Sequence, residues 1–528
     1  MKIALICTDN ESPSLGMRAI SATLKTHGHH CRLLFMETGD RKFSPAVLEE
    51  VAAMVRDCDV IGFSCLAQGS TKAKQVLGHL KALNKVTVWG GVHASLNPEE
   101  CVNYVDYVCL GEGEGMIVEL LDRLAKHRDC RDILNAAYQE NGMMVKNDVR
   151  PLISNLDELP LPDFSFDDEH HLTKDGFQQV FSLYNVERNG QIVFTSSRGC
   201  AFYCTYCCNI KLKNLYAGRE HYVRRMSVSR LIEHSQQLRK RFPKGKYFYF
   251  IDEDFAARSN QELAELAERF PSEVGLPFEC LAHPVRITTK KLALLTQAGL
   301  FRMRIGVETG SERTKREIYN RHVSNEVVIR AANTIGQSPH VAPVYFFIYA
   351  NPYENRDDIL STLQLIASLP HGSSIQAFEL MFFPGSILFE RAVQDNLITK
   401  DNESAHELSY YGRLHHTEHA WKRKNLYVNG LLFLSGGHCT HYRIGLLPRV
   451  LFNFLIHPAV IDFNEQHTLL IRVLILMKES IYRLRSLLAH LVKIFIKDPI
   501  AIYNFGFFLR KRLSLKSNGP QRYANGSN

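Results

Sequence analysis

The sequence predicts an α/β protein with two parallel sheets, followed by a mainly helical region. Short apolar runs alternate with helical patterns over residues 1–126, and the same alternation resumes at Gln191. Beyond about Glu403 the strand patterns end, and helical, apolar and basic segments replace them. The composition, with 45% hydrophobic and 22% charged residues, is that of a folded globular protein. A length of 528 residues suggests about three domains.

The first predicted sheet is doubly wound and parallel, with a Rossmann-like alternation of strands and helices. Strands that are continuously apolar and separated by helices form sheets that are covered on both faces. The five strand patterns are Lys2–Cys7, Cys31–Phe35, Val60–Ser64, Val86–Trp89 and Tyr107–Leu110. Ligands of such sheets bind at the carboxyl ends of the strands. Several glycines fall at these ends, namely Gly16, Gly90, Gly91, Gly111 and Gly113.

Residues 136–190 are predicted to be a linker between residues 1–135 and a second α/β domain. The segment Leu156–Phe164 holds two prolines and several acids, which neither a helix nor a central strand accommodates. Residues 191–402 then show six strand–helix units, the pattern of an open (β/α)6 barrel of the TIM type. The strand patterns are Ile192–Thr195, Tyr247–Ile251, Phe278–Leu281, Arg302–Val307, Val344–Ile348 and Ile375–Leu380. A helical basic region over 403–516 and a tail over 517–528 that is disordered by composition complete the predicted order.

The basic excess of the chain is confined to its last fifth. Residues 421–528 hold 16 Lys and Arg against 4 Asp and Glu, whereas residues 1–420 hold 47 against 51. A nucleic-acid enzyme is therefore disfavoured, because the tail alone would have to neutralise a phosphate backbone. The opening MKIALICTDN lacks a signal-peptide pattern, and no stretch of 18 uncharged apolar residues occurs, so we expect a cytoplasmic protein.

The most specific motif is a set of three cysteines within eight residues, directly after the first strand of the predicted barrel. Cys200, Cys204 and Cys207 can bind three irons of a cuboidal [4Fe–4S] cluster and leave the fourth iron without a protein ligand. A structural zinc site usually has four protein ligands in two pairs, and no second C-x-x-C follows these cysteines. Cys208 is an alternative ligand. We expect most of the other cysteines to be buried core residues.

The spacing C-x3-C-x-Φ-C, with Tyr206 as the aromatic residue, resembles that of the radical S-adenosylmethionine (SAM) superfamily over residues 191–400. The resemblance implies that Cys200, Cys204 and Cys207 hold the cluster and that the amino acid part of SAM chelates the fourth iron. It also implies reductive cleavage of SAM to a 5′-deoxyadenosyl radical, with an external electron donor of the flavodoxin or ferredoxin type.

Two further segments are similar to SAM-contacting motifs of that superfamily. Asp252-Glu-Asp254-Phe is similar to its acidic motif near the methionyl amine, and Gly306-Val-Glu308-Thr-Gly-Ser is similar to its G-x-E-x-G-S motif. Taken alone, either carboxylate is also compatible with a helix cap or a strand end. The segment Phe347–Glu354 departs from the usual G-x-P-G-E-T form, because it lacks both glycines.

The N-terminal sheet resembles a cobalamin-binding domain over residues 1–126. Ser64-Cys-Leu66 matches the S-x-L motif of such domains, and Gly90-Gly91 matches the paired glycines along which the nucleotide tail of cobalamin lies. The segments Val92–Glu100 and Gly111-Glu-Gly-Glu are similar to the versions that are fused to radical SAM barrels.

The usual D-x-H-x-x-G motif, which supplies an axial histidine to cobalt, is absent from this sequence. The corresponding loop has Pro13 where that histidine would stand. His93 is the nearest alternative, and in the fused subgroup its position is ordinarily a corrin-edge or loop residue. We therefore expect cobalamin to bind without a histidine on cobalt.

Together the resemblances imply a cobalamin-dependent radical SAM enzyme, with a C-methyltransferase acting on an unactivated carbon as the leading hypothesis. The 5′-deoxyadenosyl radical would activate the substrate, and methylcobalamin would supply the methyl group. One alternative is a cobalamin-linked oxidation or ring-forming enzyme without methyl transfer. A second alternative is a non-catalytic cobalamin or redox sensor.

The C-terminal region has two interpretations. Its apolar segments Leu469–Met477 and Ser486–Lys497 are punctuated by Lys and Arg, and Phe505–Arg512 follows them. They form either a peripheral membrane surface, which suits a lipid-like substrate, or a helical lid on the barrel, which suits a soluble small molecule. The His-rich segments Leu414–His419 and His438–His441 are irregularly spaced, which favours solvent or substrate positions over metal binding.

Overall fold

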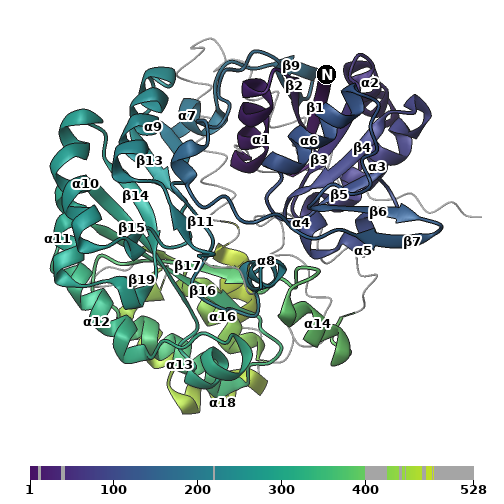
Figure 1. The fold of residues 1–528 in the computed structure, drawn as a ribbon. Coiled ribbons are helices and arrows are strands. Elements are labelled where there is room, and N and C mark those ends of the chain that lie inside the picture. Colours follow the sequence, from purple (N-terminus) through teal and green to yellow (C-terminus); the bar gives the residue numbers. More distant parts are fainter. Residues whose placement is uncertain are drawn as a thin grey trace, which may run out of the picture. The chain divides into compact units, whose positions relative to one another are not determined.

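The computed structural model describes residues 1–9, 14–36, 42–217, 221–398, 425–438, 443–445, 447–466, 471–478 and 480. Residues Met1–Ile461 form one compact unit, and Asp462–Asn528 form a second. Both predicted sheets lie in the first unit (Figure 1).

The N-terminal sheet is doubly wound, as predicted. Its five central strands are parallel and follow the order β2-β1-β3-β4-β5. They are β1 (Lys2–Cys7), β2 (His30–Phe35), β3 (Val60–Ser64), β4 (Val86–Gly90) and β5 (Tyr107–Cys109). The chain winds outward in both directions from β1 and β3, so their carboxyl ends form the switch point at which such sheets bind ligands.

Helices cover both faces of this sheet. They are α1 (Leu15–Thr26), α2 (Pro45–Val55), α3 (Ser70–Leu80), α4 (Gly91–Leu96), α5 (Pro98–Cys101) and α6 (Glu114–Ala125). Ile3 and Leu5 of β1 share one core with residues of α1 and α6. Ala4 and Ile6 share the other core with residues of α2 and α3. The alternation of buried side chains on the two faces explains the continuous apolar runs of the sequence.

The segment predicted as a linker supplies four strands to the same sheet. They are β6 (Ala136–Glu140), β7 (Met143–Lys146), β8 (Glu169–Thr173) and β9 (Gly176–Gln179). β6 and β7 extend the β5 edge, and β8 and β9 extend the β2 edge. A linker without secondary structure was therefore the wrong expectation for these residues. The strands are short edge strands with many polar and exposed positions, so their periodicity is weak.

The second sheet is the predicted open barrel, with six parallel strands in sequential order. They are β10 (Gln191–Phe194), β13 (Tyr247–Phe250), β14 (Phe278–Ala282), β15 (Leu300–Glu308), β16 (Ala342–Tyr349) and β17 (Ser374–Glu379). β10 forms one edge, and the two-residue strand β18 (Gly437–His438) pairs antiparallel with β17 at the other.

Helices pack on the outer face of the barrel. They include α9 (Val228–Arg241), α10 (Asn260–Glu273), α11 (Thr289–Gln297), α12 (Asn325–Gly336) and α13 (Arg356–Ser368), preceded by α7 (Tyr184–Asn189). Phe250 of β13 and Phe278 of β14 contact Phe270 of α10. Because side chains alternate along a strand, Tyr249 and Glu279 lie on the opposite, inner face. Ser259 and Glu262 form a capping box that fixes the start of α10.

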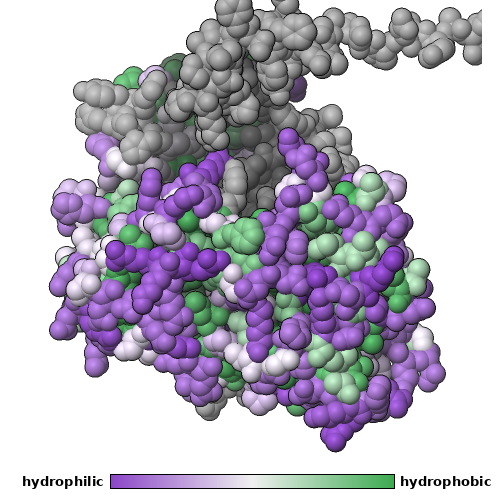
Figure 2. All heavy atoms as spheres, turned by 90° about the horizontal axis from the view of Figure 1, so that it is seen from above, coloured by the Kyte–Doolittle hydropathy of each residue, from purple (hydrophilic) through white to green (hydrophobic). Residues whose placement is uncertain are grey.

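The described parts of the C-terminal region are mainly helical, as predicted. They contain α16 (Leu426–Ser435), α17 (Arg449–Leu455) and α18 (Pro458–Gln466), with the short strands β19 (Arg443–Ile444) and β20 (Leu447–Pro448). The helix α14 (Ile387–Gln394) precedes this region and lies at the end of the segment predicted as the barrel. Residues 403–424, Ser486–Lys497, Phe505–Arg512 and the predicted tail 517–528 lie outside the described residues. On the face drawn in Figure 2, hydrophilic residues surround smaller hydrophobic areas. Within the described ranges, no helix is long and apolar enough to span a bilayer.

Candidate active site

The three predicted cluster ligands lie at the carboxyl end of β10, in a loop whose base is a two-stranded pair. The strands β11 (Ser197–Arg198) and β12 (Arg224–Arg225) are antiparallel, and Arg198 stands opposite Arg224. We call the segment between them, residues 199–223, the cysteine loop. It also contains the helix α8 (Asn209–Leu215). Cys204 is buried, and Cys200 and Cys207 are half-buried.

Residues that follow β15 hold the middle of the cysteine loop. The backbone N–H of Thr205 donates to the carbonyl of Tyr319 at 3.0 Å, and its hydroxyl donates to the carbonyl of Ile318 at 2.5 Å. The side-chain amide of Asn320 donates to the carbonyl of Tyr203 at 3.0 Å. The loop is thus fixed to the same strand that ends in Glu308.

Arg321 places a buried positive charge beside Cys204. Its Nη1 lies 3.5 Å from the Sγ of Cys204, and its Nη2 donates to the carbonyl of Gly306 at 2.5 Å. Burial raises the pKa of the Cys204 thiol, and the guanidinium of Arg321 acts against that rise. Burial also raises the pKa of Cys200 to about 12. A neighbouring hydrogen bond from Cys208 lowers the pKa of Cys207.

The thiol arrangement fits an iron–sulfur cluster better than a single metal ion. Across the described part of the chain, no three His, Cys, Asp or Glu side chains lie close enough together to hold one ion. A cuboidal cluster makes a different demand, because each thiolate binds a separate iron. Without iron, burial raises the pKa values of Cys200 and Cys204. Bound iron would favour their thiolate forms.

Glu308 has a strained backbone that directs its carboxylate toward the cysteine loop. Its φ is +72°, a region that non-glycine residues rarely adopt, and the register of β15 and β16 shifts between Gly306 and Glu308. Burial raises the pKa of Glu308, while Arg321 and a hydrogen bond to Tyr206 lower it. A side chain at Gly306 would collide with this carboxylate. Tyr206 is in turn in edge contact with Tyr319, at 4.9 Å between ring centroids.

The two predicted aspartates hold loops together. Asp252 is buried and accepts hydrogen bonds from the backbone N–H of Ser196 at 3.1 Å and from its hydroxyl at 2.7 Å. Asp254 accepts from the backbone N–H of His283 at 3.2 Å and from Nε of Arg286 at 3.3 Å. Both carboxylates thus already accept hydrogen bonds within the protein.

Glu253, which lies between them, is exposed and is hydrogen-bonded to Asn209 at the start of α8. Its charge acts on both Cys200 and Cys207, and it interacts with Asn209, whose amide also lies 3.6 Å from the Sγ of Cys207. The surrounding protein raises the pKa of Glu253. Sequence reasoning singled out the two aspartates and missed Glu253. Phe250 packs outward against α10. Because side chains alternate along a strand, the residue three positions later, Glu253, is expected on the inner side, and this pattern could have identified it.

His283 is a second site residue that sequence reasoning missed. Its ring is stacked on Phe202 of the cysteine loop, with centroids 3.8 Å apart and an interplanar angle of 19°. Burial and the charges of Arg321 and Arg286 lower its pKa to about 2. Among the described residues its buried Nε2 has no hydrogen-bond partner.

A cavity of about 300 Å³ lies at the switch point of the N-terminal sheet. Ser64, Gly90 and Gly91, which were predicted to contact the cobalamin tail, are among the residues that line it. At Gly91 φ is +86°, and a Cβ atom there would lie 2.8 Å from the hydroxyl of Ser64. The strand ends therefore leave room only because these positions are small.

Two other predicted residues lie apart from this cavity. Leu66 is exposed and does not line it; its backbone N–H donates to both carboxylate oxygens of Asp9 at 2.9 Å. His93 is buried against Trp89, with its Nε2 3.6 Å from Glu100, and it does not line the cavity either. Burial lowers the pKa of His93.

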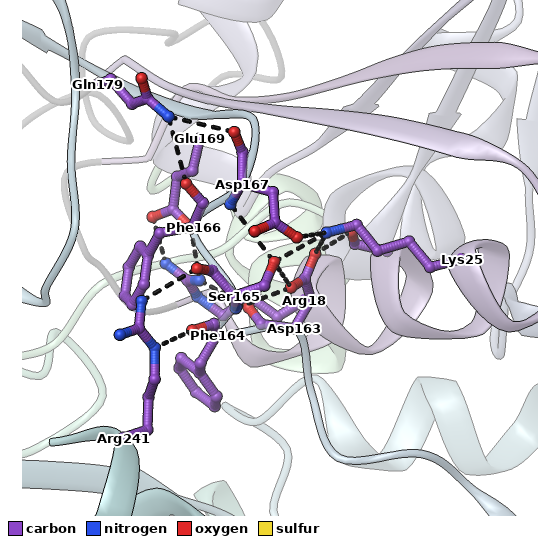
Figure 3. A network of polar contacts seen from close by, with 11 residues as sticks. Arg18, Lys25, Asp163, Phe164, Ser165, Phe166, Asp167, Glu169, Gln179 and Arg241 are labelled. Carbon is purple, nitrogen blue, oxygen red and sulfur yellow. Dashed lines mark hydrogen bonds and ion pairs between the residues drawn. The ribbon is translucent and has the colours of Figure 1, made fainter.

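The predicted linker forms one wall of the cavity. Leu156, Leu159, Pro160 and Pro162 line it opposite the glycines. Just beyond them, the segment 163–169 is held on α1 by a polar network (Figure 3).

Arg18 of α1 is the centre of that network. It is fully buried, donates to both carboxylate oxygens of Glu169 at 2.7 and 2.6 Å, and donates to the carbonyl of Asp163 at 2.8 Å. Arg241 of α9 donates to the carbonyl of Phe164 at 2.6 Å (Figure 3). The network therefore joins the wall to both sheets.

Residues that lead into the cysteine loop also line the cavity. Thr195, Ser197 and Arg198, which precede Cys200, line the cavity together with the ends of the N-terminal strands. A ligand in the cavity would therefore touch the residues that immediately precede the cysteine loop.

The sequence matches two protein families at these two sites. Residues 1–121 match the B12 binding domain, and residues 194–366 match the Radical SAM superfamily. An uncharacterised methyltransferase of Pyrococcus horikoshii is 26% identical over 495 residues, which cover 89% of this chain and 96% of the relative. Cytidylyl-2-hydroxyethylphosphonate methyltransferase of Streptomyces wedmorensis is 24% identical over 452 residues, which cover 75% of this chain and 80% of that enzyme.

A solved structure has the same fold. It is TsrM of Kitasatospora setae, a radical SAM methyltransferase with tryptophan and a SAM analogue bound, with a TM-score of 0.60, 15% identity and coverage of 75% and 76% of the two chains. The two family matches fall on the cavity and the cysteine loop, and the relatives extend over most of the chain. The chain therefore combines a match to the B12 binding domain with a match to the Radical SAM superfamily, and it is similar over most of its length to proteins named as methyltransferases.

Proposed function

We propose that this protein is a C-methyltransferase that acts on an unactivated carbon of a small-molecule or lipid-like substrate, with a [4Fe–4S] cluster, SAM and cobalamin as cofactors. The observation that carries the proposal is that Thr195, Ser197 and Arg198 line the cavity two to five residues before Cys200. The two cofactor sites are thus contiguous, which transfer of a methyl group to a substrate radical requires.

Each part of the site has a proposed role. Cys200, Cys204 and Cys207 hold the cluster, with Tyr206 packed behind it. Glu253 orients the ammonium group of SAM, because its charge acts on two of the cluster cysteines. Glu308 makes a polar contact to SAM, and its strained backbone is the cost of placing the carboxylate there.

Ser64, Gly90 and Gly91 take the cobalamin tail in the cavity. No histidine is among the described residues that line it, and His93 is turned toward Glu100, so we propose that cobalt has no histidine ligand. When bound, the cofactors supply a carbon-centred radical that removes hydrogen from an unactivated carbon, and a weakly bonded methyl group. The chain binds both cofactors, orients them and excludes water.

Labelled SAM tests the reaction class. Anaerobic reconstitution is expected to give close to four irons per chain, and turnover with methyl-labelled SAM is expected to give labelled product and 5′-deoxyadenosine. Turnover without label would instead support the oxidation or ring-forming alternative. SAM that stays uncleaved under dithionite would support a sensor.

Matched cysteine variants test the cluster ligands. Cys204→Ala is expected to lose iron and 5′-deoxyadenosine formation, whereas Cys208→Ala keeps both. A cluster that survives Cys204→Ala contradicts the assignment.

The thiols must stay reduced to bind iron, so we propose a cytoplasmic enzyme that receives electrons from a flavodoxin or ferredoxin. We propose no nucleic-acid partner. The basic C-terminal residues are proposed to form a helical lid, with a peripheral membrane surface as the alternative. Flotation with anionic vesicles separates the two. Binding that weakens with salt and disappears when the chain is cut after about residue 465 supports the membrane surface.

A further inference from the structure

We propose that Glu112 and Glu114 couple occupancy of the cavity to the order of the cysteine loop, so that cobalamin and the iron–sulfur cluster bind cooperatively. The inference rests on the proposed function, because it takes the cavity and the loop as the sites of these two cofactors. Both glutamates act as positioning residues, through Arg198 and the base of the loop.

The base of the cysteine loop brings two positive charges together. Arg198 and Arg224 are directly opposite each other in the pair β11–β12. The Arg198 side chain is 25% exposed, and that of Arg224 is 5% exposed. Like charges at opposed positions destabilise a strand pair, more so where water is excluded. Negative charges beside Arg198 and Arg224 are therefore needed to stabilise the pairing of β11 with β12.

The N-terminal domain supplies these counter-charges. Oε1 of Glu112 lies 3.1 Å from Nη1 of Arg198 and 2.9 Å from Nη1 of Arg224. Oε1 of Glu114 lies 2.5 Å from Nη2 of Arg198. Two carboxylates thus neutralise two guanidinium groups. Glu114 and Arg224 are buried, and Arg198 and Glu112 are half-buried, so a charge left here without its partner would be unfavourable.

Glu112 also holds the other end of the described part of the loop. Its backbone N–H donates to the hydroxyl of Tyr216 at 2.8 Å, and Tyr216 follows α8 directly. At Gly111 φ is +69°, and any side chain there would collide with the Tyr216 ring. One short segment of the N-terminal domain therefore contacts the loop both before Cys200 and after Cys207.

The same residues line the cavity. Glu112, Glu114 and Arg198 are all part of its surface. A ligand that fills the cavity displaces water from these ion pairs, which strengthens them, and it contacts both partners. A ligand that favours the closed base of the loop also favours the order of the cysteines. By thermodynamic linkage, an ordered loop must then favour the cavity ligand by the same factor.

Hydroxocobalamin binding to the full-length chain, with and without the reconstituted cluster, measures this coupling. We expect the dissociation constant to be about tenfold lower with the cluster present, within the usual range of coupling between sites. In chain without cluster, hydroxocobalamin is expected to slow amide hydrogen exchange over residues 199–217. Neither measurement requires turnover.

Glu112→Gln tests the carboxylate, since it keeps the size of the side chain and removes its charge. We expect it to bind hydroxocobalamin with a coupling factor close to one and no change in exchange over residues 199–217. Glu119→Gln is the matched control, because Glu119 lies in α6, directly after the segment that holds Glu112, and pairs instead with Arg123 and Arg150. It is expected to keep the full coupling.

Gly111→Ala is a second variant that keeps every charge and displaces Tyr216. It is expected to reduce the coupling between the two cofactor sites. If Glu112→Gln does not fold, this variant alone tests whether Glu112 and its neighbours carry the coupling. Tenfold coupling in both variants overturns the inference, as does wild-type chain in which hydroxocobalamin leaves the loop unprotected. If wild-type protein without this coupling still methylates its substrate, the coupling proposal is wrong and the proposed function stands. Wild-type chain that binds no hydroxocobalamin at all rejects the proposed function together with it.

Discussion

The buried guanidinium of Arg321 lies 3.5 Å from the Sγ of Cys204, and its charge also acts on Tyr206 and Glu308. Its second nitrogen donates to the carbonyl of Gly306, so the charge is fixed to β15. One cation therefore acts on a thiol, a phenol and a carboxyl group. An iron–sulfur cluster with thiolate ligands would add negative charge beside it.

Arg321→Gln is expected to weaken the cluster. It removes a charged hydrogen-bond donor from a buried site, a loss of about 1.5–3 kcal/mol. We expect reconstituted iron to be released to a chelator faster than from the wild type, while Arg321→Lys keeps part of the effect. Arg316→Gln is a suitable control, because Arg316 is largely exposed on the preceding turn. Equal release from Arg321→Gln and the wild type would show that the charge has no such role.

Glu308→Gly is expected to stabilise the protein and to abolish SAM binding. The φ of +72° at Glu308 costs a non-glycine residue about 1–2 kcal/mol, and glycine adopts it without strain. Part of this gain is offset by the greater freedom of glycine in the unfolded chain. Glu308→Gln keeps the strain and loses only the charge. The melting temperature should therefore rise in the first variant alone, while SAM affinity falls in both.

Much of the fold was predictable because the central strands of both sheets are parallel. Buried parallel strands such as Val60–Ser64 and Phe278–Ala282 give continuous apolar runs, and the helices between them have clear periodicity. The strands β6–β9 were missed because they are short and polar, and their place in the sheet depends on neighbours far apart in the sequence.

The site was only partly predictable for a related reason. Spacing alone identified the three cysteines, since ligands of one cluster are close in the sequence. Whether Asp252, Glu253 or Asp254 contacts the loop depends on which face of β13 packs on α10. The contact of Glu112 with Arg198 joins residues 86 positions apart, and no local pattern indicates it.

Arg18→Met is expected to be strongly destabilising and to weaken cobalamin binding. Arg18 is fully buried and bonds to both oxygens of Glu169, so its loss leaves a buried carboxylate without its main partner, at a cost of about 3–5 kcal/mol. The segment 163–169 would then hold the cavity wall less firmly (Figure 3). The double variant Arg18→Met with Glu169→Leu removes both charges and should recover much of the stability. A double variant no more stable than Arg18→Met would contradict this account.

Glu354 predicts a pH dependence of stability. Burial raises its pKa to about 7, and the hydroxyl of Thr309 donates to it at 2.8 Å. Because the folded state binds the proton more tightly than the unfolded chain, this group's contribution to stability is fully present below the ordinary glutamate pKa. It is lost as the pH rises toward 7, by about 3 kcal/mol in all.

Glu354→Gln should remove this loss, since the amide is neutral at every pH and its oxygen still accepts from Thr309. We expect the difference in melting temperature between pH 5 and pH 8 to shrink in this variant. Glu326→Gln, in the first turn of α12, is the control. A pH dependence identical in Glu354→Gln and the wild type would assign the effect to other groups.

Glu253→Gln and Asp252→Asn should separate binding from stability. The charge of Glu253 acts on the cysteine loop, so the first variant is expected to lose about tenfold in SAM affinity, equivalent to about 1.4 kcal/mol, with an unchanged melting temperature. Asp252 is buried and accepts from Ser196, with Arg258 3.9 Å away. The second variant removes its charge and is expected to cost about 1.5–3 kcal/mol of stability. Isothermal titration with SAM and thermal unfolding, both on cluster-loaded protein, measure the two effects. The opposite result would be a loss of SAM affinity in Asp252→Asn at full stability, with the affinity of Glu253→Gln unchanged. That result would show that Asp252, and not Glu253, contacts the ammonium group of SAM.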